Sequence, residues 1–164
     1  MKKHNPKNKY FIAEIGVNHG ANLKTALKCI KLAKEGGADA VKFQCYKAEK
    51  LSSKLAGSYW DKKVEAENSQ LKLYKKLDKF GNYEYERLYK YCKKIKIDFI
   101  ITPFDTDSIN FFKNKVKYFK ISSSDLTNIP LIEKIANTQK NVIISSGASN
   151  KKEIKFALNI LKNN

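Results

Sequence analysis

The stretch between residues 11 and 20 has the sequence FIAEIGVNHG, and it is the first indication of the fold. An apolar run that ends in Gly, Asn, His and Gly, followed by a helical pattern, is typical of a buried strand whose carboxyl end opens into a polar turn. Glu14 interrupts this run. Because an unpaired carboxylate is unstable in an apolar layer, we expect Glu14 to meet a cation, a hydrogen-bond donor or a ligand. An outward strand position, with an ion pair to one of the many lysines, is the alternative.

The rest of the chain alternates between helical and strand patterns. Asn22 can cap a helix whose apolar residues recur at 3.6-residue spacing, and Gly36 and Gly37 can end it. Pro130 is well placed in the first turn of a later helix. The expected strands cover residues 11–16, 38–45, 98–102, 117–122 and 141–145. The expected helices lie near residues 23–35, 69–79, 85–95, 109–113, 130–138 and 154–161, the last with Ile154, Phe156, Ala157, Ile160 and Leu161 facing inward. Five strands alternating with helices predict an α/β chain with a parallel sheet.

Length and composition fit one folded domain preceded by a short basic tail at residues 1–9. The chain has 164 residues, of which 42% are hydrophobic, which is enough for a core. Its net charge of +17 would suit nucleic acid or an acidic surface. However, Arg87 is the only arginine among 33 basic residues, and base readout and bidentate phosphate contacts favour arginine. We therefore expect neither nucleic acid nor membrane as a partner, and an anionic small substrate instead.

The cysteines and the apolar segments indicate the compartment. Cys29, Cys45 and Cys92 are odd in number, widely spaced and in apolar surroundings, so we expect small buried side chains in a reducing environment. No segment has the 18 or more apolar residues of a membrane span, and no apolar signal-peptide core follows the first residues. The expected localisation is cytoplasmic.

Polar side chains collect where the expected strands end. In α/β proteins the ligand meets the carboxyl ends of parallel strands. Lys42 and Lys120 lie in otherwise apolar strands, where a lysine needs an anion to stay charged. Each alone could instead extend its ammonium group to solvent. Both together, beside hydroxyl-rich turns, predict a bound phosphate or carboxylate.

Five blocks, in order along the chain, resemble the signature blocks of the sialic acid synthases, the N-acetylneuraminate synthase family. They are AEIGVNH at 13–19, GADAVKFQ at 37–44, TPFD at 102–105, KISSSDLTNIP at 120–130 and SSG at 145–147. The resemblance implies a (β/α)8 barrel of the TIM type that condenses phosphoenolpyruvate with N-acetylmannosamine or a related amino sugar. The products would be a sialic-acid-type nonulosonate and phosphate.

The resemblance also implies roles for individual residues. Lys42, Lys120 and the hydroxyl groups would hold the phosphate and carboxylate of phosphoenolpyruvate. Glu14 would lie beside the reacting carbons, and Asn18 and His19 would shape the turn, although His19 alone could also suggest a metal ligand. The expected catalytic residues are Glu14, Lys42, Lys120 and Asp125, and the expected substrate-binding residues are Gln44, Thr102, Ser123, Ser145, Asn18 and His19, with Gln44 and Asp125 touching the sugar.

The chain is short for such a barrel. Eight strands need roughly 200 to 250 residues, and about five βα units are present here. The resemblance therefore implies that the C-terminal strands, the ligands of a divalent metal (Mn or Mg) and an antifreeze-like domain lie beyond this region. We expect the isolated chain to be inactive or weakly active, and to be completed by a homodimer partner or a complementing C-terminal half. A non-catalytic remnant that binds phosphoenolpyruvate or a partner chain, and a basic nucleic-acid binder, are the alternatives.

Overall fold

A computed structural model describes residues 9–163 and contains one parallel sheet of five strands. The strands are β1 (Ile12–Gly16), β2 (Ala40–Cys45), β3 (Asp98–Pro103), β4 (Tyr118–Ile121) and β5 (Asn141–Ile144). Each strand pairs with the next one along the chain, so the spatial order is β1-β2-β3-β4-β5. This confirms the predicted α/β fold. Residues 1–8 of the expected basic tail lie outside the described residues.

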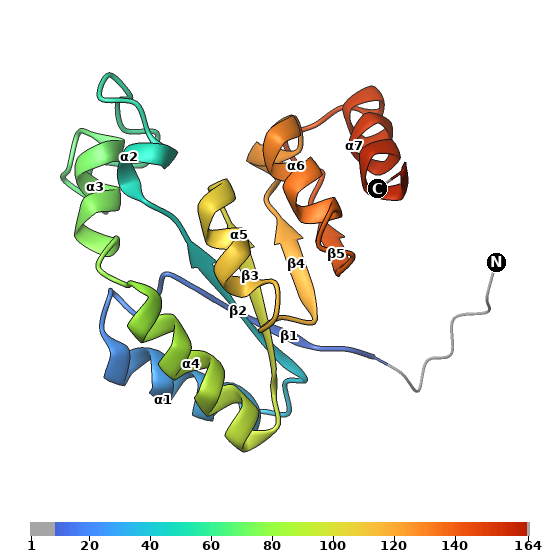
Figure 1. The fold of residues 1–164 in the computed structure, drawn as a ribbon. Coiled ribbons are helices and arrows are strands. Elements are labelled where there is room, and N and C mark those ends of the chain that lie inside the picture. The colour runs from blue at the N-terminus through green and yellow to red at the C-terminus, as the bar shows by residue number, and fades with distance from the viewer. Residues whose placement is uncertain (1–8, 164) are drawn as a thin grey trace.

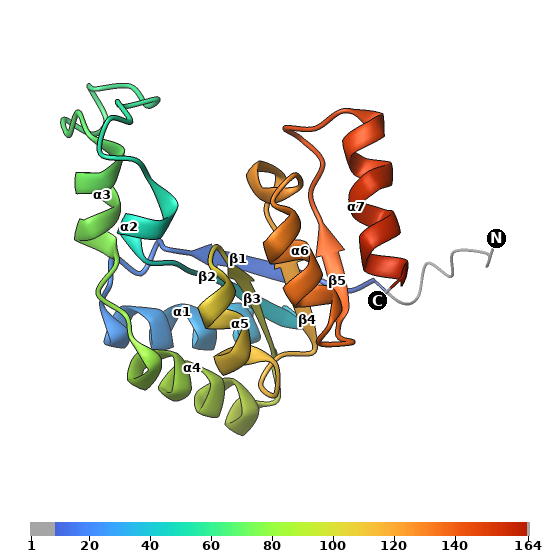
Figure 2. The ribbon, with the colours of Figure 1, turned by 45° about the horizontal axis from the view of Figure 1, so that its top comes forward.

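A helix follows each strand, and the helices after β1 to β4 return the chain to the start of the next strand. These helices are α1 (Leu23–Glu35), α4 (Asn82–Ile95), α5 (Thr106–Phe112), α6 (Ile129–Ala136) and α7 (Lys151–Asn163). Two short helices, α2 (Ala48–Leu51) and α3 (Gln70–Leu77), lie in the long connection between β2 and α4, and a 3₁₀ turn, η1 (Ser123–Asp125), follows β4. α1 packs beside α4 and α6 beside α7, while α2 and α3 extend beyond the end of β2 (Figures 1 and 2).

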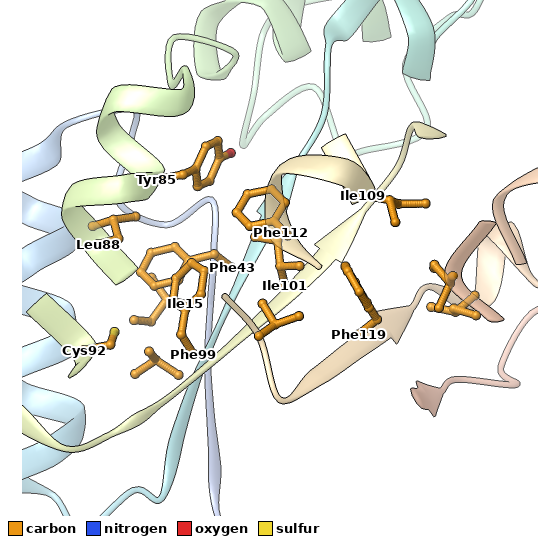
Figure 3. Packing of buried hydrophobic residues seen from close by; sticks show 14 of the residues in the cluster. Ile15, Phe43, Tyr85, Leu88, Cys92, Phe99, Ile101, Ile109, Phe112 and Phe119 are labelled. Atoms are coloured by element: carbon orange, nitrogen blue, oxygen red, sulfur yellow. The ribbon is translucent and has the colours of Figure 1, made fainter. Parts of the chain in front are cut away.

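The two faces of the sheet differ in chemistry because successive side chains of a strand point to opposite sides. On β2, Val41 and Phe43 join the hydrophobic core beneath the helices, whereas Lys42 and Gln44 lie on the other face. Figure 3 shows Phe43, Phe99 and Phe119 packed in this core. A core on one face leaves the other face of the sheet for polar side chains.

The start and end signals in the sequence correspond to real helix ends. Asn22 caps α1 by accepting a hydrogen bond from the Thr25 N–H, and Gly36 ends that helix. Pro130 lies in the first turn of α6. α5 begins at Thr106, earlier than predicted, because the Asp105 carboxylate accepts from two N–H groups of its first turn.

Some predictions about burial and secondary structure need correction. The first strand is not buried along its whole length, since Phe11 is 60% and Ile12 39% exposed. Phe156 does not face inward and is 52% exposed. Adjacent residues of an α-helix are rotated by 100° about its axis, so Phe156 points away from the direction of Ala157, which is fully buried. Cys29 and Cys45 are only partly buried, although all three cysteines are free thiols. The four-residue helix α2 was not predicted.

None of the helices within residues 9–163 combines the length and the hydropathy needed to cross a bilayer.

Candidate active site

Lys42 is held in the sheet by two partners on the neighbouring strands. Glu14 and Lys42 are register partners, and the Lys42 Nζ lies 2.9 Å from the Glu14 Oε2. The same nitrogen donates a hydrogen bond of 2.9 Å to the Thr102 Oγ1. Lys42 is 6% exposed, so its ammonium group does not extend to solvent. A buried ammonium group is stable when it is paired in this way.

Within residues 9–163, Lys120 has hydroxyl and carbonyl partners but no carboxylate partner. Its Nζ donates to the Ser145 Oγ at 2.5 Å and to the Ile121 carbonyl at 2.7 Å. Among the described residues, none of the ion pairs includes Lys120. Burial, followed by the positive charge of Lys42, lowers the pKa of Lys120, and Glu14 opposes this only in part. The cluster of Glu14, Lys42 and Lys120 therefore holds two cationic groups and one carboxylate, and an anion would neutralise the excess.

Gly16 lets the end of β1 approach these groups. Its φ of +56° is in the left-handed region, and the register between β1 and β2 shifts between Glu14 and Gly16. A Cβ atom at this position would lie 3.1 Å from the Glu14 Oε1 and 3.9 Å from the Gln44 Oε1. The missing side chain thus allows Glu14 and Gln44 to converge above the sheet.

Asn18 and His19 form the turn after β1. The Asn18 N–H donates to the Ile15 carbonyl, and the His19 Nδ1 accepts from the Ala21 N–H at 3.2 Å. The His19 ring is 3% exposed and stacks on Phe80 with 4.4 Å between centroids. Burial lowers the pKa of His19, so the neutral ring is favoured. This geometry supports a structural role for His19 in the turn.

Metal ligation finds no support in the part of the chain that the structure describes. Residues 9–163 contain no group of three or more His, Cys, Asp or Glu side chains that could hold a metal ion. The described residues therefore do not fit the divalent metal that the resemblance implies for a full enzyme.

Asp125 and Ser123 lie in η1 after β4. The Asp125 carboxylate accepts hydrogen bonds from the Ser124 Oγ and the Asn128 Nδ2, both at 3.2 Å. These bonds stay within its own turn, so Asp125 does not join the Glu14–Lys42 pair. The structure thus brings together Glu14, Lys42, Gln44, Thr102, Lys120 and Ser145, and leaves Asn18, His19, Ser123 and Asp125 in the flanking turns.

Sequence reasoning missed a cavity of about 590 Å³ beside Gln44. The turns after β1, β3 and β4 form its floor, and α2 and α3 cover it. Three tyrosines and two glutamines supply its aromatic and amide groups: Gln44, Tyr46, Tyr59, Gln70 and Tyr74. The sequence offered no clear signal for this cavity, because Tyr46, Tyr59 and Tyr74 are far apart along the chain and converge only when the segment between β2 and α4 folds back.

Comparison with known proteins assigns the family. The sequence model of the NeuB family matches residues 29–164. The chain belongs to the NeuB family. The N,N'-diacetyllegionaminic acid synthase of Campylobacter jejuni is 40% identical to it over 161 residues, which cover 96% of this chain and 48% of that protein. Human N-acetylneuraminate-9-phosphate synthase is 33% identical over 157 residues, covering 93% and 43%. This NeuB-family chain thus spans about half the length of the curated relatives it matches.

Solved structures agree with the fold of this NeuB-family chain. The N-acetylneuraminic acid synthetase of Leptospira borgpetersenii, solved in complex with citrate, has a TM-score of 0.80 at 35% identity, covering 95% of this chain and 51% of that one. A truncated 3-deoxy-D-arabino-heptulosonate 7-phosphate synthase of Thermotoga maritima has a TM-score of 0.65 at 14% identity, which is a likeness of fold alone. The five βα units therefore correspond to an incomplete barrel of the TIM type.

Proposed function

We propose that this chain carries the N-terminal half of an active site that condenses phosphoenolpyruvate with N-acetylmannosamine or a related amino sugar. The products would be a sialic-acid-type nonulosonate and phosphate. The observation that carries this proposal is the Lys120 ammonium group, which has no carboxylate partner among the described residues and lies close enough to Lys42 for their charges to repel. The relatives named as sialic acid and legionaminic acid synthases support the same chemistry.

Binding of the donor follows from the charges and hydroxyl groups. Lys42 and Lys120 would attract the phosphate and carboxylate groups of phosphoenolpyruvate, and charge-assisted hydrogen bonds in a partly buried site are strong. The hydroxyl groups of Thr102 and Ser145 already accept from the two ammonium groups, so their own protons are free to point towards an anion. Ser123, at the start of η1, would add a further donor when the turn closes on the ligand.

Glu14 would serve the reaction itself. In the proposed condensation, C3 of phosphoenolpyruvate forms a bond to the aldehyde carbon of the sugar, water adds to C2, and phosphate leaves with cleavage of its bond to carbon. The side chain of Glu14 is 58% exposed although one of its oxygens pairs with Lys42. Its carboxylate can therefore accept a proton from the water that attacks C2 and stabilise positive charge developing there.

Gln44, at the end of β2, and Asp125, in the turn after β4, would contact the acceptor sugar. A divalent metal, when bound by the complete enzyme, would polarise the aldehyde oxygen. Because the described residues do not fit such a metal, we expect its ligands from the remaining strands of the barrel. We propose a C-terminal half of the enzyme, including an antifreeze-like domain, as the source of these ligands. A homodimer of this chain is the alternative assembly.

Donor binding by the 164-residue chain gives the first test. Titration calorimetry with phosphoenolpyruvate should show binding, and Lys120→Gln should weaken it about 10-fold or more because the uncompensated charge is lost. Lys117→Gln is the matched control, since Lys117 lies at the opposite end of β4 and pairs with Asp98. If phosphoenolpyruvate does not bind, or if both variants weaken it equally, the proposal is wrong.

Catalysis gives the second test. Phosphate release from phosphoenolpyruvate and N-acetylmannosamine in the presence of Mn²⁺ should appear only when a polypeptide supplying the rest of the barrel is added. Donor binding without release in either case would indicate a non-catalytic chain that binds phosphoenolpyruvate. Turnover by the chain alone, at roughly 1 to 1,000 per second, would show that no second polypeptide is needed.

A further inference from the structure

A second cavity lies on the helix face of the sheet, away from the charged cluster. This helix-face cavity has a volume of about 310 Å³, at the lower end of the range for small-molecule sites, about 300–1,000 Å³. Cys45 at the end of β2 lines it, together with residues of α2, α4 and α5. Because the side chains of a strand alternate between its two faces, Cys45 lies on the face opposite Lys42 and Gln44. A ligand in this cavity would therefore not meet one bound at Lys42 and Lys120.

Aromatic rings set at right angles to one another line the helix-face cavity. The ring planes of Phe80 and Tyr85 make an angle of 80°, with centroids 5.8 Å apart. Tyr85 and Phe112, which lie together in Figure 3, have centroids 5.3 Å apart at 83°. Phe111 meets Phe112 in the same way, at 4.9 Å and 85°. Perpendicular rings offer edges as well as faces, and the face of an aromatic ring attracts a cation.

The charged side chains around this cavity leave one carboxylate without a cation in contact. Lys47 pairs with Asp78 at 2.9 Å, and Lys50 pairs with Asp107. Among the described residues, none of the ion pairs includes Asp105, and Lys50 attracts it only at longer range. These five side chains carry two positive and three negative charges. The cavity thus has an excess of negative charge in a chain whose net charge is +17.

Two side-chain oxygens at this cavity can still accept a hydrogen bond. The Asp105 Oδ1 accepts from the Asp107 and Ser108 N–H groups at the start of α5, whereas its Oδ2 has no hydrogen-bond partner among the described residues. The side-chain amide of Asn82, in the first turn of α4, has none there either. The Cys45 thiol adds no charge, because burial raises its pKa to about 12. The cavity therefore combines an aromatic lining with one free carboxylate oxygen and one free amide oxygen.

A small primary amine with an apolar body matches this arrangement. Its ammonium group has three N–H donors, so it can bond to both oxygens and neutralise Asp105, while its body packs on the rings. A carboxylate or phosphate would instead be repelled by Asp105. A quaternary ammonium group has no N–H to donate. A neutral apolar molecule would cover the Asp105 carboxylate without balancing its charge.

We propose that the helix-face cavity is a second ligand site, which takes a small primary amine with an apolar body. The residues that line it come from α2, α4, α5 and the segments that join these helices to β2 and β3, so the site is formed within the described chain. The inference does not rest on the proposed function, because the donor cluster lies on the other face of the sheet.

The test compares three probes that share a phenyl ring: phenethylammonium, its trimethylated derivative and hydrocinnamate, which is an anion. In NMR titrations of the isotope-labelled 164-residue chain, phenethylammonium should shift the amide signals of Cys45 and Ser108. It should bind about 5-fold or more tightly than either of the other probes. Non-specific attraction by the net charge of +17 would give the opposite order, with the anion bound best.

Two variants locate the site. Asp105→Asn keeps an oxygen to cap α5 but removes the charge, and it should weaken phenethylammonium binding about 5- to 10-fold. Asn82 is exposed, so Asn82→Ala keeps the fold even if the first variant is destabilised, and it should weaken binding about 2- to 3-fold. Asp61→Asn is the matched control, because the Asp61 carboxylate also accepts from a backbone N–H two residues further on but does not line the cavity. Its affinity should equal that of the parent chain.

Tighter binding of hydrocinnamate, or unchanged affinity in both cavity variants, would overturn the inference. Displacement of phenethylammonium by phosphoenolpyruvate would also overturn it, because the amine would then occupy the charged cluster. If phosphoenolpyruvate binds and the amine does not, only the inference fails. If the amine binds with the expected selectivity and phosphoenolpyruvate does not bind, the proposed function fails and the second site stands.

Discussion

Lys42 and Lys120 look alike in the sequence, yet their surroundings give them different roles. Lys42 has its counter-ion within the sheet, since Glu14 lies 2.9 Å away. Lys120 is held by the Ser145 hydroxyl and a backbone carbonyl, which orient its ammonium group without neutralising it. Lys120 is thus the residue whose charge state should respond most to an incoming anion.

The affinity for phosphoenolpyruvate should fall as the pH rises, and it should fall at a lower pH than if Lys120 had the pKa of an ordinary lysine. Burial and Lys42 lower the pKa of Lys120 below 10.5, while Glu14 acts in the opposite direction. The ammonium group is present below this lowered pKa and is lost as pH rises through it, so binding is strong below it and weak above. Titrations between about pH 7 and pH 10, where the phosphate is fully ionised, would measure this dependence.

Lys120→Arg provides the control for this pH dependence. Arginine stays charged over the whole range, so anion binding by this variant should change little with pH even if its absolute affinity is altered. An identical decline in the variant and in the parent chain would show that another group is responsible.

Gly16→Ala should destabilise the fold. The position has φ of +56°, and the new Cβ would lie 3.1 Å from the Glu14 Oε1. We expect a loss of about 1–2 kcal/mol in the free energy of unfolding, measured by urea denaturation. Gly57→Ala is the control, since its φ is outside the left-handed region and its Cβ meets nothing within 4 Å. A loss no greater than that of Gly57→Ala would contradict this account of the turn.

The site residues that could be predicted from the sequence are the charged residues that stand among apolar neighbours. Glu14, Lys42 and Lys120 interrupt apolar strands, so their need for partners followed from the sequence, and the structure brings these three together. Tyr46 gave no such signal because tyrosine is a common residue in and beside strands. The burial of its hydroxyl group depends on the packing of α3 near the end of β2, which the sequence does not reveal.

At the scale of elements, side-chain contacts hold the first strand in the sheet in addition to its backbone hydrogen bonds with β2. β1 is an edge strand in the described structure and pairs only with β2. Just before it, the Tyr10 hydroxyl donates to the Asp98 Oδ2 at 2.6 Å, and Lys117 pairs with the same oxygen at 3.3 Å. Three segments of the chain therefore meet at the amino-terminal edge of the sheet, opposite the candidate site.

Tyr10→Phe should loosen β1 without abolishing the fold. It removes one hydrogen bond to a charged acceptor that is partly exposed, so we expect a loss of about 0.5–1 kcal/mol in the free energy of unfolding. Amide hydrogen exchange in β1 should become faster, while exchange in β3 changes little. Tyr118→Phe, which keeps the neighbouring ring 5.8 Å away, should leave exchange in β1 unchanged. Unchanged exchange in Tyr10→Phe would show that the strand ladder alone holds β1.

Long periodic elements were predicted better than short ones. The helix expected near residues 85–95 is present as α4, and Tyr85, Leu88 and Cys92, which repeat at helical spacing, form its buried face. α2 has only four residues, and in so short a helix periodicity cannot appear. The Gly57–Ser69 bridge, which closes the loop between α2 and α3, joins residues 12 positions apart and left no local pattern.

At the scale of the whole molecule, the net charge of +17 should oppose folding through repulsion. Raising NaCl from about 10 to 150 mM shortens the screening length from about 30 to 8 Å, so the melting temperature should rise. Salt also weakens surface ion pairs such as Lys75–Glu49. Because the chain has 33 basic residues and few such pairs, we expect the screening of repulsion to have the larger effect. Choline chloride at equal ionic strength should give the same increase. A melting temperature that falls with salt would show that the attractive pairs dominate.

The consecutive order of the strands bears on how the polypeptide emerges from the ribosome. Within residues 9–163, each strand after β1 adds beside the strand synthesised immediately before it, so these five strands can pair with one another in the order of their synthesis. Pairings that are near in sequence form quickly, and N-terminal units fold first during synthesis. The sheet can therefore grow vectorially, with the pair of Glu14 and Lys42 formed before Lys120 has left the exit tunnel.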